Sequence, residues 1–288
     1  MTQNEVISKL REDMELRGYS QITISDYITR TKYYQNHYNK SADEMHEAEV
    51  RAFLHFQRIK RNNQGSTLNT YNSTLRFLYE VTLEKPISYR KVPRAKETRR
   101  LPQLPSKEDI ATLFMFTKDL RYRAMFMTIY GSGLRVSELV SLKISDIDSK
   151  NSRIIIRMGK GKKDRFALLP RATLFILREY YKAYRPKEWL FENKDGNRLT
   201  TRAVQKAFGD IVEKSEMEKK PTLHTLRHCF ATHLLNDGKN LIEIKRLLGH
   251  ARIDTTAWYL QLSDNQALSL TSPLDSPEFS RNFARSSV

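Results

Sequence analysis

The sequence predicts a mainly α-helical protein of two domains that also contains one small β-hairpin or sheet. Apolar residues recur at helical spacing along most of the 288 residues, and only the stretch 153–169 changes to short β-rich runs. A basic segment with prolines, residues 93–105, divides the chain. We therefore expect an N-terminal helical domain over 1–92, a second domain over 106–270 and a C-terminal tail over 271–288.

The charge balance points to a polyanionic partner. The formal net charge is +17 and the pI is near 9.8, so the surface attracts polyanions, and release of their counterions favours binding. Nucleic acid is the favoured partner, and an anionic membrane is the competing polyanion. No apolar run reaches the ~20 residues that cross a bilayer, and no signal-peptide pattern opens the chain. The single cysteine, Cys229, excludes an internal disulfide, and its apolar neighbours indicate a buried residue. We expect a cytoplasmic protein without a membrane partner.

Four helices are expected in the N-terminal domain, enough for a small bundle. The helical spacing covers residues 6–16, 24–34, 50–59 and 68–81. Gly18 suits the end of the first helix, and Ser20 or Thr23 suits the N-cap of the second. Nothing in this domain carries chemistry, so we interpret it as a binding module.

Basic residues are expected on the polar faces of this bundle and along the linker. In the bundle these are Arg30, Lys32, Lys40, Arg51, Arg58, Lys60, Arg61 and Arg76, and in the linker Arg94, Lys96, Arg99 and Arg100. They form either an ordinary solvated surface or a face that contacts DNA phosphates, with Thr67 and Asn69 as further contacts. Prolines keep the linker extended, so that it either follows a phosphate backbone or simply connects the domains.

The second domain begins with helices and a glycine break. Ser106, followed by acidic residues, suits a helix start, and residues 120–130 continue the helical spacing. A Gly-Ser-Gly run then interrupts the helix and places Arg135 at the start of the next one. There the guanidinium either binds a phosphate together with the helix end or pairs with Glu138 on the same helix.

A β-hairpin is expected where the period changes. Residues 153–157 and 165–169 are β-rich runs, and the segment between them is rich in glycine and lysine. Lys160 stands between two glycines, which allow close approach to a backbone, and Lys162 and Lys163 follow it. Such a lysine binds phosphate, or donates a proton where neighbouring positive charge lowers its pKa; otherwise the hairpin is a basic surface that touches DNA.

Helices return after the hairpin, over residues 173–184, 200–216, 224–236, 241–248 and 253–262. Phosphodiester cleavage requires a nucleophile, donors for the non-bridging oxygens and an acid for the leaving oxygen. This domain contains a candidate for each of these tasks. Arg135 and Arg227 are donors, Lys160 is an acid, His224 and His250 donate or shuttle protons, and Tyr259 attacks once nearby cations lower its pKa from about 10.

The combination of these residues resembles the signature of the tyrosine recombinases, the phage-integrase family. The matching motifs, in the order and spacing of that family, are Gly133-Leu-Arg135-Val-Ser-Glu138-Leu, Gly159-Lys160-Gly, His224-Thr-Leu-Arg227-His228, Leu248-Gly-His250 and Tyr259. Each motif alone is weak, but all five together are specific. They cover about residues 106–265, and the N-terminal bundle is similar to the SAM-like core-binding domain of the family.

The resemblance implies a site-specific DNA recombinase whose two domains close around DNA as a C-shaped clamp. Tyr259 would attack the scissile phosphate to form a 3′-phosphotyrosyl bond, while Lys160 protonates the leaving 5′ oxygen. Arg135, Arg227 and His250 would hold the phosphate, and His224 would assist proton transfer. Glu138 and His228 would support the catalytic residues from behind.

The resemblance also implies the partners. Four copies would exchange strands between two duplexes through a Holliday junction, for integration, excision, inversion or dimer resolution, with no cofactor and no metal. A heterologous partner recombinase could replace some of the copies. Apolar Leu268, Leu270 and Leu274 in the tail would dock onto a neighbouring copy. The chain begins directly at the bundle, which favours a simple Xer-like enzyme from a bacterium, a phage or a mobile element, associated with the nucleoid.

Rival interpretations come from other classes of protein. A type IB topoisomerase-like enzyme shares much of this chemistry, and a non-catalytic DNA-binding protein shares the basic surface. A metal-dependent hydrolase would use His224 and His228, four residues apart, with His250 as third ligand. However, no glutamate lies between the first two, and Arg227 would repel the cation.

Overall fold

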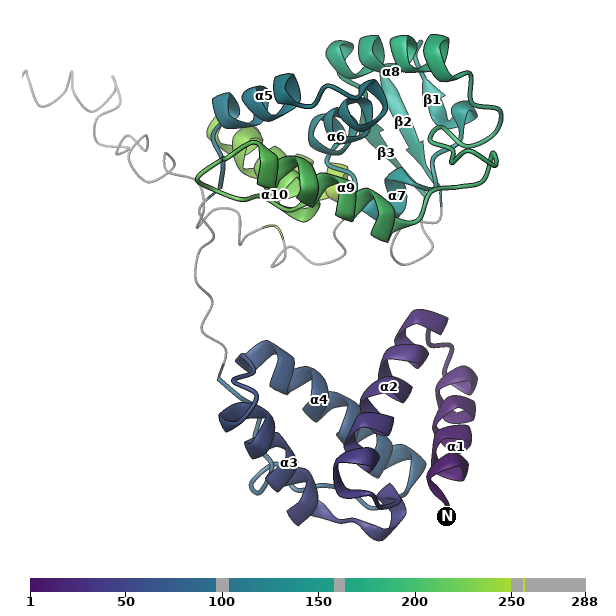
Figure 1. The fold of residues 1–288 in the computed structure, drawn as a ribbon, viewed down its shortest axis with the longest axis vertical. Helices are drawn as coiled ribbons and strands as arrows, with labels where there is room; N and C mark the ends of the chain where they lie inside the picture. Colours follow the sequence, from purple (N-terminus) through teal and green to yellow (C-terminus); the bar gives the residue numbers. More distant parts are fainter. Residues whose placement is uncertain (97–103, 158–163, 250–255, 257–288) are drawn as a thin grey trace, which may run out of the picture. The chain divides into compact units, whose positions relative to one another are not determined.

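A computed structural model describes residues 1–96, 104–157, 164–249 and 256 of the chain (Figure 1). Contacts divide the chain into two compact units, Met1–Arg100 and Leu101–Val288. Each unit has its own apolar core. The prediction of a mainly helical protein with one small sheet is confirmed.

The first unit is a helical bundle. Its elements are α1 (Gln3–Leu16), α2 (Gln21–Tyr38), η1 (Ala42–Glu44), α3 (Glu47–Ile59), α4 (Gly65–Phe77) and the π-helical turn η2 (Leu78–Thr82) that continues α4. Ser20 is the N-cap of α2 and accepts a hydrogen bond from the backbone of Thr23, and Gly18 follows α1 at φ +70°. Tyr34, Phe53 and Tyr79 fill the centre of the bundle.

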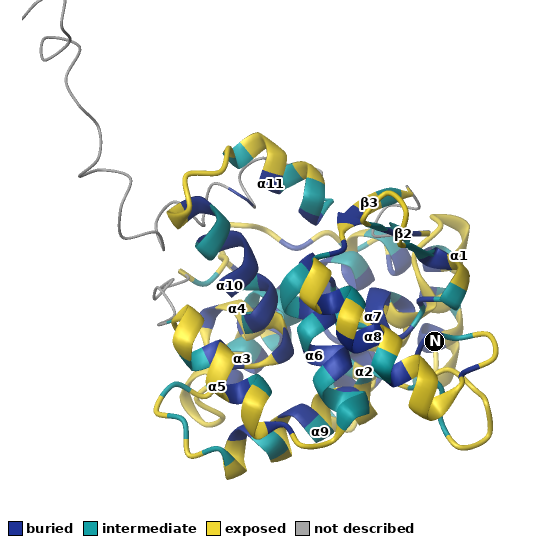
Figure 2. Cartoon of the chain, turned by 90° about the horizontal axis from the view of Figure 1, so that it is seen from above, coloured by how far each residue is buried: buried dark blue, intermediate teal, exposed yellow. Residues whose placement is uncertain are grey.

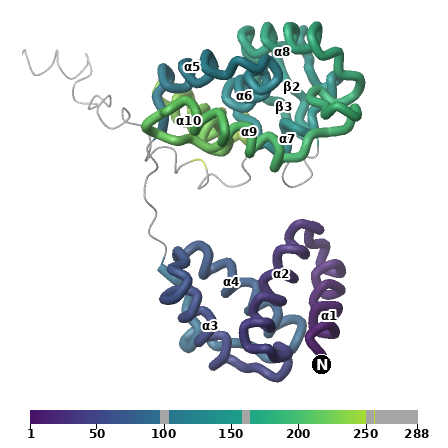
Figure 3. Tube along the Cα trace, viewed as in Figure 1, coloured from purple at the N-terminus to yellow at the C-terminus, as the bar shows by residue number. Residues whose placement is uncertain are grey.

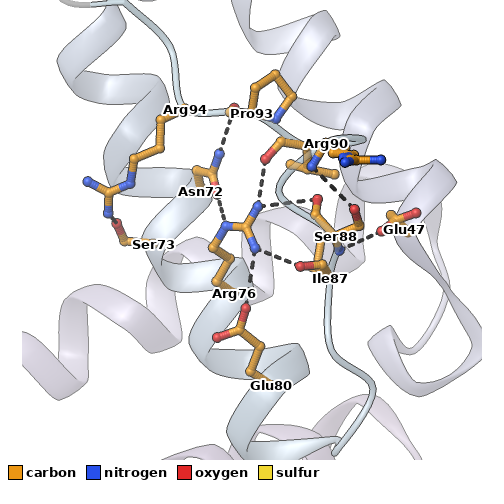
Figure 4. Close-up of polar contacts among 11 residues, drawn as sticks. Glu47, Asn72, Ser73, Arg76, Glu80, Ile87, Ser88, Arg90, Pro93 and Arg94 are labelled. Atoms are coloured by element: carbon orange, nitrogen blue, oxygen red, sulfur yellow. Dashed lines mark hydrogen bonds and ion pairs between the residues drawn. The ribbon is translucent and has the colours of Figure 1, made fainter.

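Arg76 lies inside this unit, which corrects the expectation of a solvated polar face (Figure 4). Its Nε donates to Asn72 Oδ1 at 2.9 Å, Nη1 to the carbonyl of Ile87 at 2.8 Å, and Nη2 to the carbonyl of Val92 at 2.6 Å. The guanidinium also stacks over Tyr89, 3.6 Å from the ring centroid. Arg76 therefore satisfies the backbone of the irregular segment after η2 and holds that segment against α4.

The predicted linker is anchored to the first unit where it begins. Asn69 on α4 bonds the backbone of Ala95 twice, accepting from its N–H at 2.8 Å and donating to its carbonyl at 3.0 Å. Arg94 donates to the hydroxyl of Ser73 at 3.0 Å (Figure 4). Residues up to Ala95 therefore run along α4 instead of leaving it at position 92.

The end of the linker is attached to the second unit in the same way. Lys219 donates to the carbonyl of Leu104 at 3.4 Å, and the thiol of Cys229 lies 3.8 Å from the carbonyl of Pro105. Leu104 also packs against the apolar core. Helix α5 then begins at the N-cap Ser106, whose capping box with Asp109 matches the expected helix start.

Helix α6 lies at the centre of the second unit, as the ribbon and the tube both show (Figures 1 and 3). Its elements are α5 (Lys107–Phe116), α6 (Leu120–Ser132), α7 (Val136–Leu139), η3 (Ile144–Asp146), β1 (Ile147–Asp148), β2 (Arg153–Ile156), β3 (Arg165–Leu168), α8 (Arg171–Tyr184), α9 (Thr201–Lys214), α10 (Leu223–Asn236) and α11 (Leu241–Leu248). Helices α5, α7, α8, α9 and α10 all contact α6.

The predicted hairpin is present, with one strand more than expected. Strands β2 and β3 pair antiparallel, with Ile156 opposite Arg165 and Arg153 opposite Leu168. The two-residue strand β1 adds to the other edge of β2 and pairs Ile147 with Ile154. A strand this short has no period of its own, so the sequence did not reveal it.

Helix α10 is buried on two sides (Figure 2). Leu223, Leu226 and Cys229 face the main core, whereas Phe230 and Leu235 belong to a smaller cluster with α11. Burial raises the pKa of the Cys229 thiol to about 12. The expectation of a buried cysteine is confirmed.

Among the residues that the structure describes, none of the helices combines the length and the apolar character that crossing a bilayer requires.

Candidate active site

Glu138 has a buried carboxylate that basic side chains from different elements contact. Its Oε1 accepts a hydrogen bond from Arg135 Nη1 at 2.9 Å, and its Oε2 accepts from the backbone N–H of Arg135 at 2.8 Å. Its side chain is only 5% exposed, whereas that of Arg135 is 23% exposed. Arg135 therefore pairs with Glu138, as one of the two interpretations expected, and its guanidinium still reaches the surface.

Arg227 approaches the same carboxylate from α10. Its Nη1 lies 3.6 Å from Glu138 Oε2 and also donates to the carbonyl of Gly133. Its Nη2 donates to the carbonyl of Leu248, at the end of α11, at 2.6 Å. With only 1% of its side chain exposed, Arg227 ties together the α6–α7 turn, α10 and α11.

The turn before Arg135 depends on a glycine. Gly133 ends α6 in the left-handed conformation, at φ +62°. A Cβ at this position would lie 2.5 Å from the ring of Phe230 and 3.1 Å from Leu248. Glycine is therefore required both by its backbone conformation and by the close approach of α10 and α11.

His224 and His228 stand one turn apart on α10, with ring centroids 4.3 Å apart. Although His224 remains exposed, surrounding atoms desolvate its ring and lower its pKa, and the charges of Arg227 and Arg135 lower it further. Burial, then His224 and Arg227, lower the pKa of His228 to about 4. Both imidazoles are therefore neutral at pH 7, and a neutral imidazole accepts a proton.

Some of the predicted catalytic residues lie within the described part of the chain, and others lie outside it. Arg135, His224 and Arg227 gather with Glu138 and His228 near the start of α7 and α10. Lys160, His250 and Tyr259 lie outside the described residues, as do Arg99, Arg100, Lys162 and Lys163. The flanking segments are described: β2 and β3 on either side of Lys160, and α11 with Gly249 before His250.

The residues predicted to contact DNA in the first unit differ in exposure and in their hydrogen bonds within the protein. Thr67 and Lys96 are exposed, and Arg94 is exposed while bonded to Ser73. The amide of Asn69 is engaged with the backbone of Ala95, so its first role is structural. Contact of these residues with DNA stays a prediction.

One arginine at the site was not singled out from the sequence. Arg165 on β3 donates from Nη2 to Glu138 Oε2 at 2.7 Å, and 11% of its side chain is exposed. In the sequence it was only the first residue of a β-rich run. Its inward direction follows from the strand register and from the approach of α7, neither of which a local pattern contains.

The chain matches the Phage integrase family over residues 96–266, and the N-terminal SAM-like domain of phage integrases over residues 6–89. The chain belongs to the phage integrase family. A putative integrase/recombinase of Sinorhizobium fredii is 34% identical over 93% of this chain and 87% of its own length. The tyrosine recombinase XerC of Staphylococcus epidermidis is 29% identical over 87% of this chain and 90% of its own.

Solved structures agree with the family assignment. The XerA recombinase is 28% identical, with a TM-score of 0.54, and the match covers 91% of this chain and 95% of that one. A lambda integrase dimer bound to a core site has a TM-score of 0.74 at 17% identity, over 90% of this chain and 77% of that one, and shows a shared fold. The present protein is an enzyme of the tyrosine recombinase and integrase type, and its function is site-specific recombination.

The structure offers little support for the metal-hydrolase interpretation. His224 and His228 lie close together, but no group of three His, Cys, Asp or Glu side chains within the described ranges is arranged to hold a metal ion. The proposed third ligand, His250, lies outside those ranges. Arg227 and Arg135 lower the pKa of His224 through their positive charge, and the same charge opposes a bound cation.

Proposed function

We propose that this recombinase cleaves and rejoins double-stranded DNA through a covalent bond between Tyr259 and the scissile phosphate. The observation that supports this most strongly is the convergence of Arg135 and Arg227 on buried Glu138. A carboxylate with one negative charge cannot balance these guanidinium groups, and Arg165 adds another. The remaining positive charge suits a phosphate that gains negative charge as it is attacked.

The proposed first step exchanges one phosphate ester for another. The Tyr259 oxygen attacks phosphorus as its proton passes to a base, and neutral His224 on α10 is suited to accept it. The bond from phosphorus to the 5′ oxygen breaks, and Lys160 supplies the proton that the leaving oxygen takes up. The products are a 3′-phosphotyrosyl bond and a free 5′-hydroxyl, so that the phosphate ester is conserved.

In the second step, a 5′-hydroxyl from the partner duplex attacks the phosphotyrosine and releases Tyr259. Strand exchange between two duplexes then requires four copies of the enzyme, and we propose a tetramer on DNA. The net charge of +17 supports binding of a polyanion. We assign a DNA-binding role to exposed Thr67, Arg94 and Lys96, and also to Arg99, Arg100, Lys162 and Lys163, which lie outside the described residues.

A nicked suicide substrate tests the nucleophile. Loss of the short fragment beside the scissile phosphate removes the 5′-hydroxyl, so the covalent complex accumulates and appears as a shifted band on a denaturing gel. Tyr259→Phe should abolish this band while retarding the DNA in a native gel as strongly as the wild type. A covalent band that persists in Tyr259→Phe would refute the assignment, since the adjacent residues Trp258 and Leu260 carry no hydroxyl that could replace the nucleophile.

A further inference from the structure

Arg165 contacts two segments of the candidate active site that are far from it in the sequence, the start of α7 and the end of α11. It lies on β3, the strand that follows the segment containing Lys160, and its Nη2 donates to Glu138 Oε2 at 2.7 Å. Oε2 is also the acceptor for the backbone N–H of Arg135. Arg165 and Arg135 thus hold one carboxylate from two sides.

The position of Arg165 is fixed by its surroundings. The β-ladder places its backbone opposite Ile156, and its side chain is 11% exposed. A Cβ on Gly249 would lie 2.5 Å from Arg165 Cδ and 2.6 Å from its Nε. The side chain therefore passes directly against the backbone of Gly249, which immediately precedes His250.

The hydrogen bonding of Arg165 differs from that of an arginine that only stabilises the fold. All three guanidinium nitrogens of Arg76 donate to protein acceptors. In contrast, Arg165 Nη1 is buried and has no hydrogen-bond partner within the described ranges. Burial lowers the pKa of Arg165, Glu138 raises it and Arg135 lowers it again. The guanidinium of Arg165 is therefore buried with only part of its hydrogen-bonding capacity satisfied by the described residues.

We propose that Arg165 is a positioning residue for the scissile phosphate: it fixes Glu138 and thereby the guanidinium of Arg135. This inference rests on the proposed function. Loss of Arg165 would remove the 2.7 Å contact to Oε2 and leave this oxygen to the backbone N–H of Arg135 and to Arg227 at 3.6 Å. The carboxylate would then shift and displace the guanidinium of Arg135 from the phosphate. A displacement of this kind costs on the order of 10²-fold in rate.

The test compares Arg165→Gln with Arg153→Gln on the nicked suicide substrate. Arg153 is a matched control because it lies in the same sheet and pairs with Asp148 at 2.8 Å, without contact to Glu138. We expect single-turnover cleavage to fall ~10²-fold in Arg165→Gln and to change little in Arg153→Gln. Native gels should show similar DNA binding for both variants, and thermal unfolding should confirm that both are folded.

Two modified substrates separate positioning of Arg135 from other roles. A methylphosphonate at the scissile position removes the negative charge that Arg135 binds, so Arg165→Gln should then cleave nearly as fast as the wild type. A 5′-bridging phosphorothiolate, which leaves without an acid, should not rescue it. In the background Glu138→Gln, the further change Arg165→Gln should have little additional effect, because both residues act through the same contact.

Several outcomes would overturn the inference. Equal cleavage by Arg165→Gln and Arg153→Gln would show that Arg165 has no such role. Rescue by the phosphorothiolate would show that Arg165 acts through Lys160 and not through Arg135. If Arg165→Gln does not fold, Arg165→Lys is tested instead, because it keeps the charge but has one nitrogen in place of the guanidinium fork. The inference then requires cleavage of the methylphosphonate at the wild-type rate and slower cleavage of the ordinary phosphate. Absence of any covalent complex in the wild type would refute the proposed function itself, which distinguishes the two failures.

Discussion

The two units of this recombinase each contain a buried arginine, and the two residues have different surroundings. Arg76 in the first unit donates from all of its nitrogens, mainly to backbone carbonyls, and stacks on Tyr89. Arg227 in the second unit shares the carboxylate of Glu138 with Arg135 and Arg165. In the first unit the arginine completes the fold, whereas in the second several arginines surround one carboxylate and leave positive charge for a ligand.

Among changes to these arginines, the largest effect on cleavage is expected for Arg227→Lys. Lysine keeps the charge but cannot donate to Gly133, Leu248 and Glu138 in the forked geometry of a guanidinium. Cleavage of the suicide substrate should fall about 10³-fold, the loss typical of a removed transition-state donor. Single-turnover kinetics measure this, and a loss of less than tenfold would contradict a role for Arg227 at the phosphate.

Arg76→Lys should reduce stability and leave cleavage nearly unchanged. The buried carbonyls of Ile87 and Val92 would lose their donors, which should destabilise the first unit by about 3 kcal/mol. Urea unfolding of the full chain measures the change, and cleavage under conditions where the variant is folded should remain close to that of the wild type. Exposed Arg58 provides the control, since Arg58→Lys should leave stability nearly unchanged.

A buried histidine makes the stability of the second unit depend on pH. The pKa of His228 is about 4 in the folded protein, below its usual value of about 6.5. This histidine therefore binds more protons when unfolded, so its contribution is complete above pH 6.5 and is lost as the pH falls through 4, up to about 3 kcal/mol. His228→Gln should reduce the difference between unfolding at pH 7.5 and at pH 4.5; an unchanged difference would show that His228 is not responsible.

A smaller effect is expected for Asn69→Ala. The change removes both side-chain hydrogen bonds to Ala95, with an expected cost of about 1–2 kcal/mol. Proteolysis of the linker should become faster, because residues up to Ala95 would no longer be held along α4. Thr67→Ala, on the same helix and exposed, serves as the control. Equal proteolysis of the two variants would show that Asn69 does not anchor the linker.

Local sequence patterns predicted the features that neighbouring residues determine. Ser106 was placed correctly at a helix start, and Ser20 was one of the two caps proposed for α2, because a capping residue and its partner lie within one turn. The β2–β3 hairpin followed from two β-rich runs around a turn, and Arg135 was placed at the start of a helix by the glycine break. The resemblance to the family motifs then assigned the predicted catalytic residues to one active site.

The features that the sequence did not reveal depend on packing between distant segments. Arg76 was assigned to a polar face because its burial results from residues 87–92 folding back over α4. Strand β1 exists only as a partner of β2. Arg165 joins the site because strand register and the close approach of Gly249 direct it to Glu138. Helical and β-strand periods describe one element at a time and do not contain this information.

The buried thiol has a practical consequence for following the enzyme in solution. Cys229 is the only cysteine of the chain, and it is fully buried with its pKa raised to about 12. The thiolate is the form that attacks a maleimide, so this residue should resist labelling in the folded protein. Cysteines introduced on the surface of each unit would accept a pair of fluorophores without removal of the native residue. Energy transfer between the dyes would then report directly how the two units move when DNA is added.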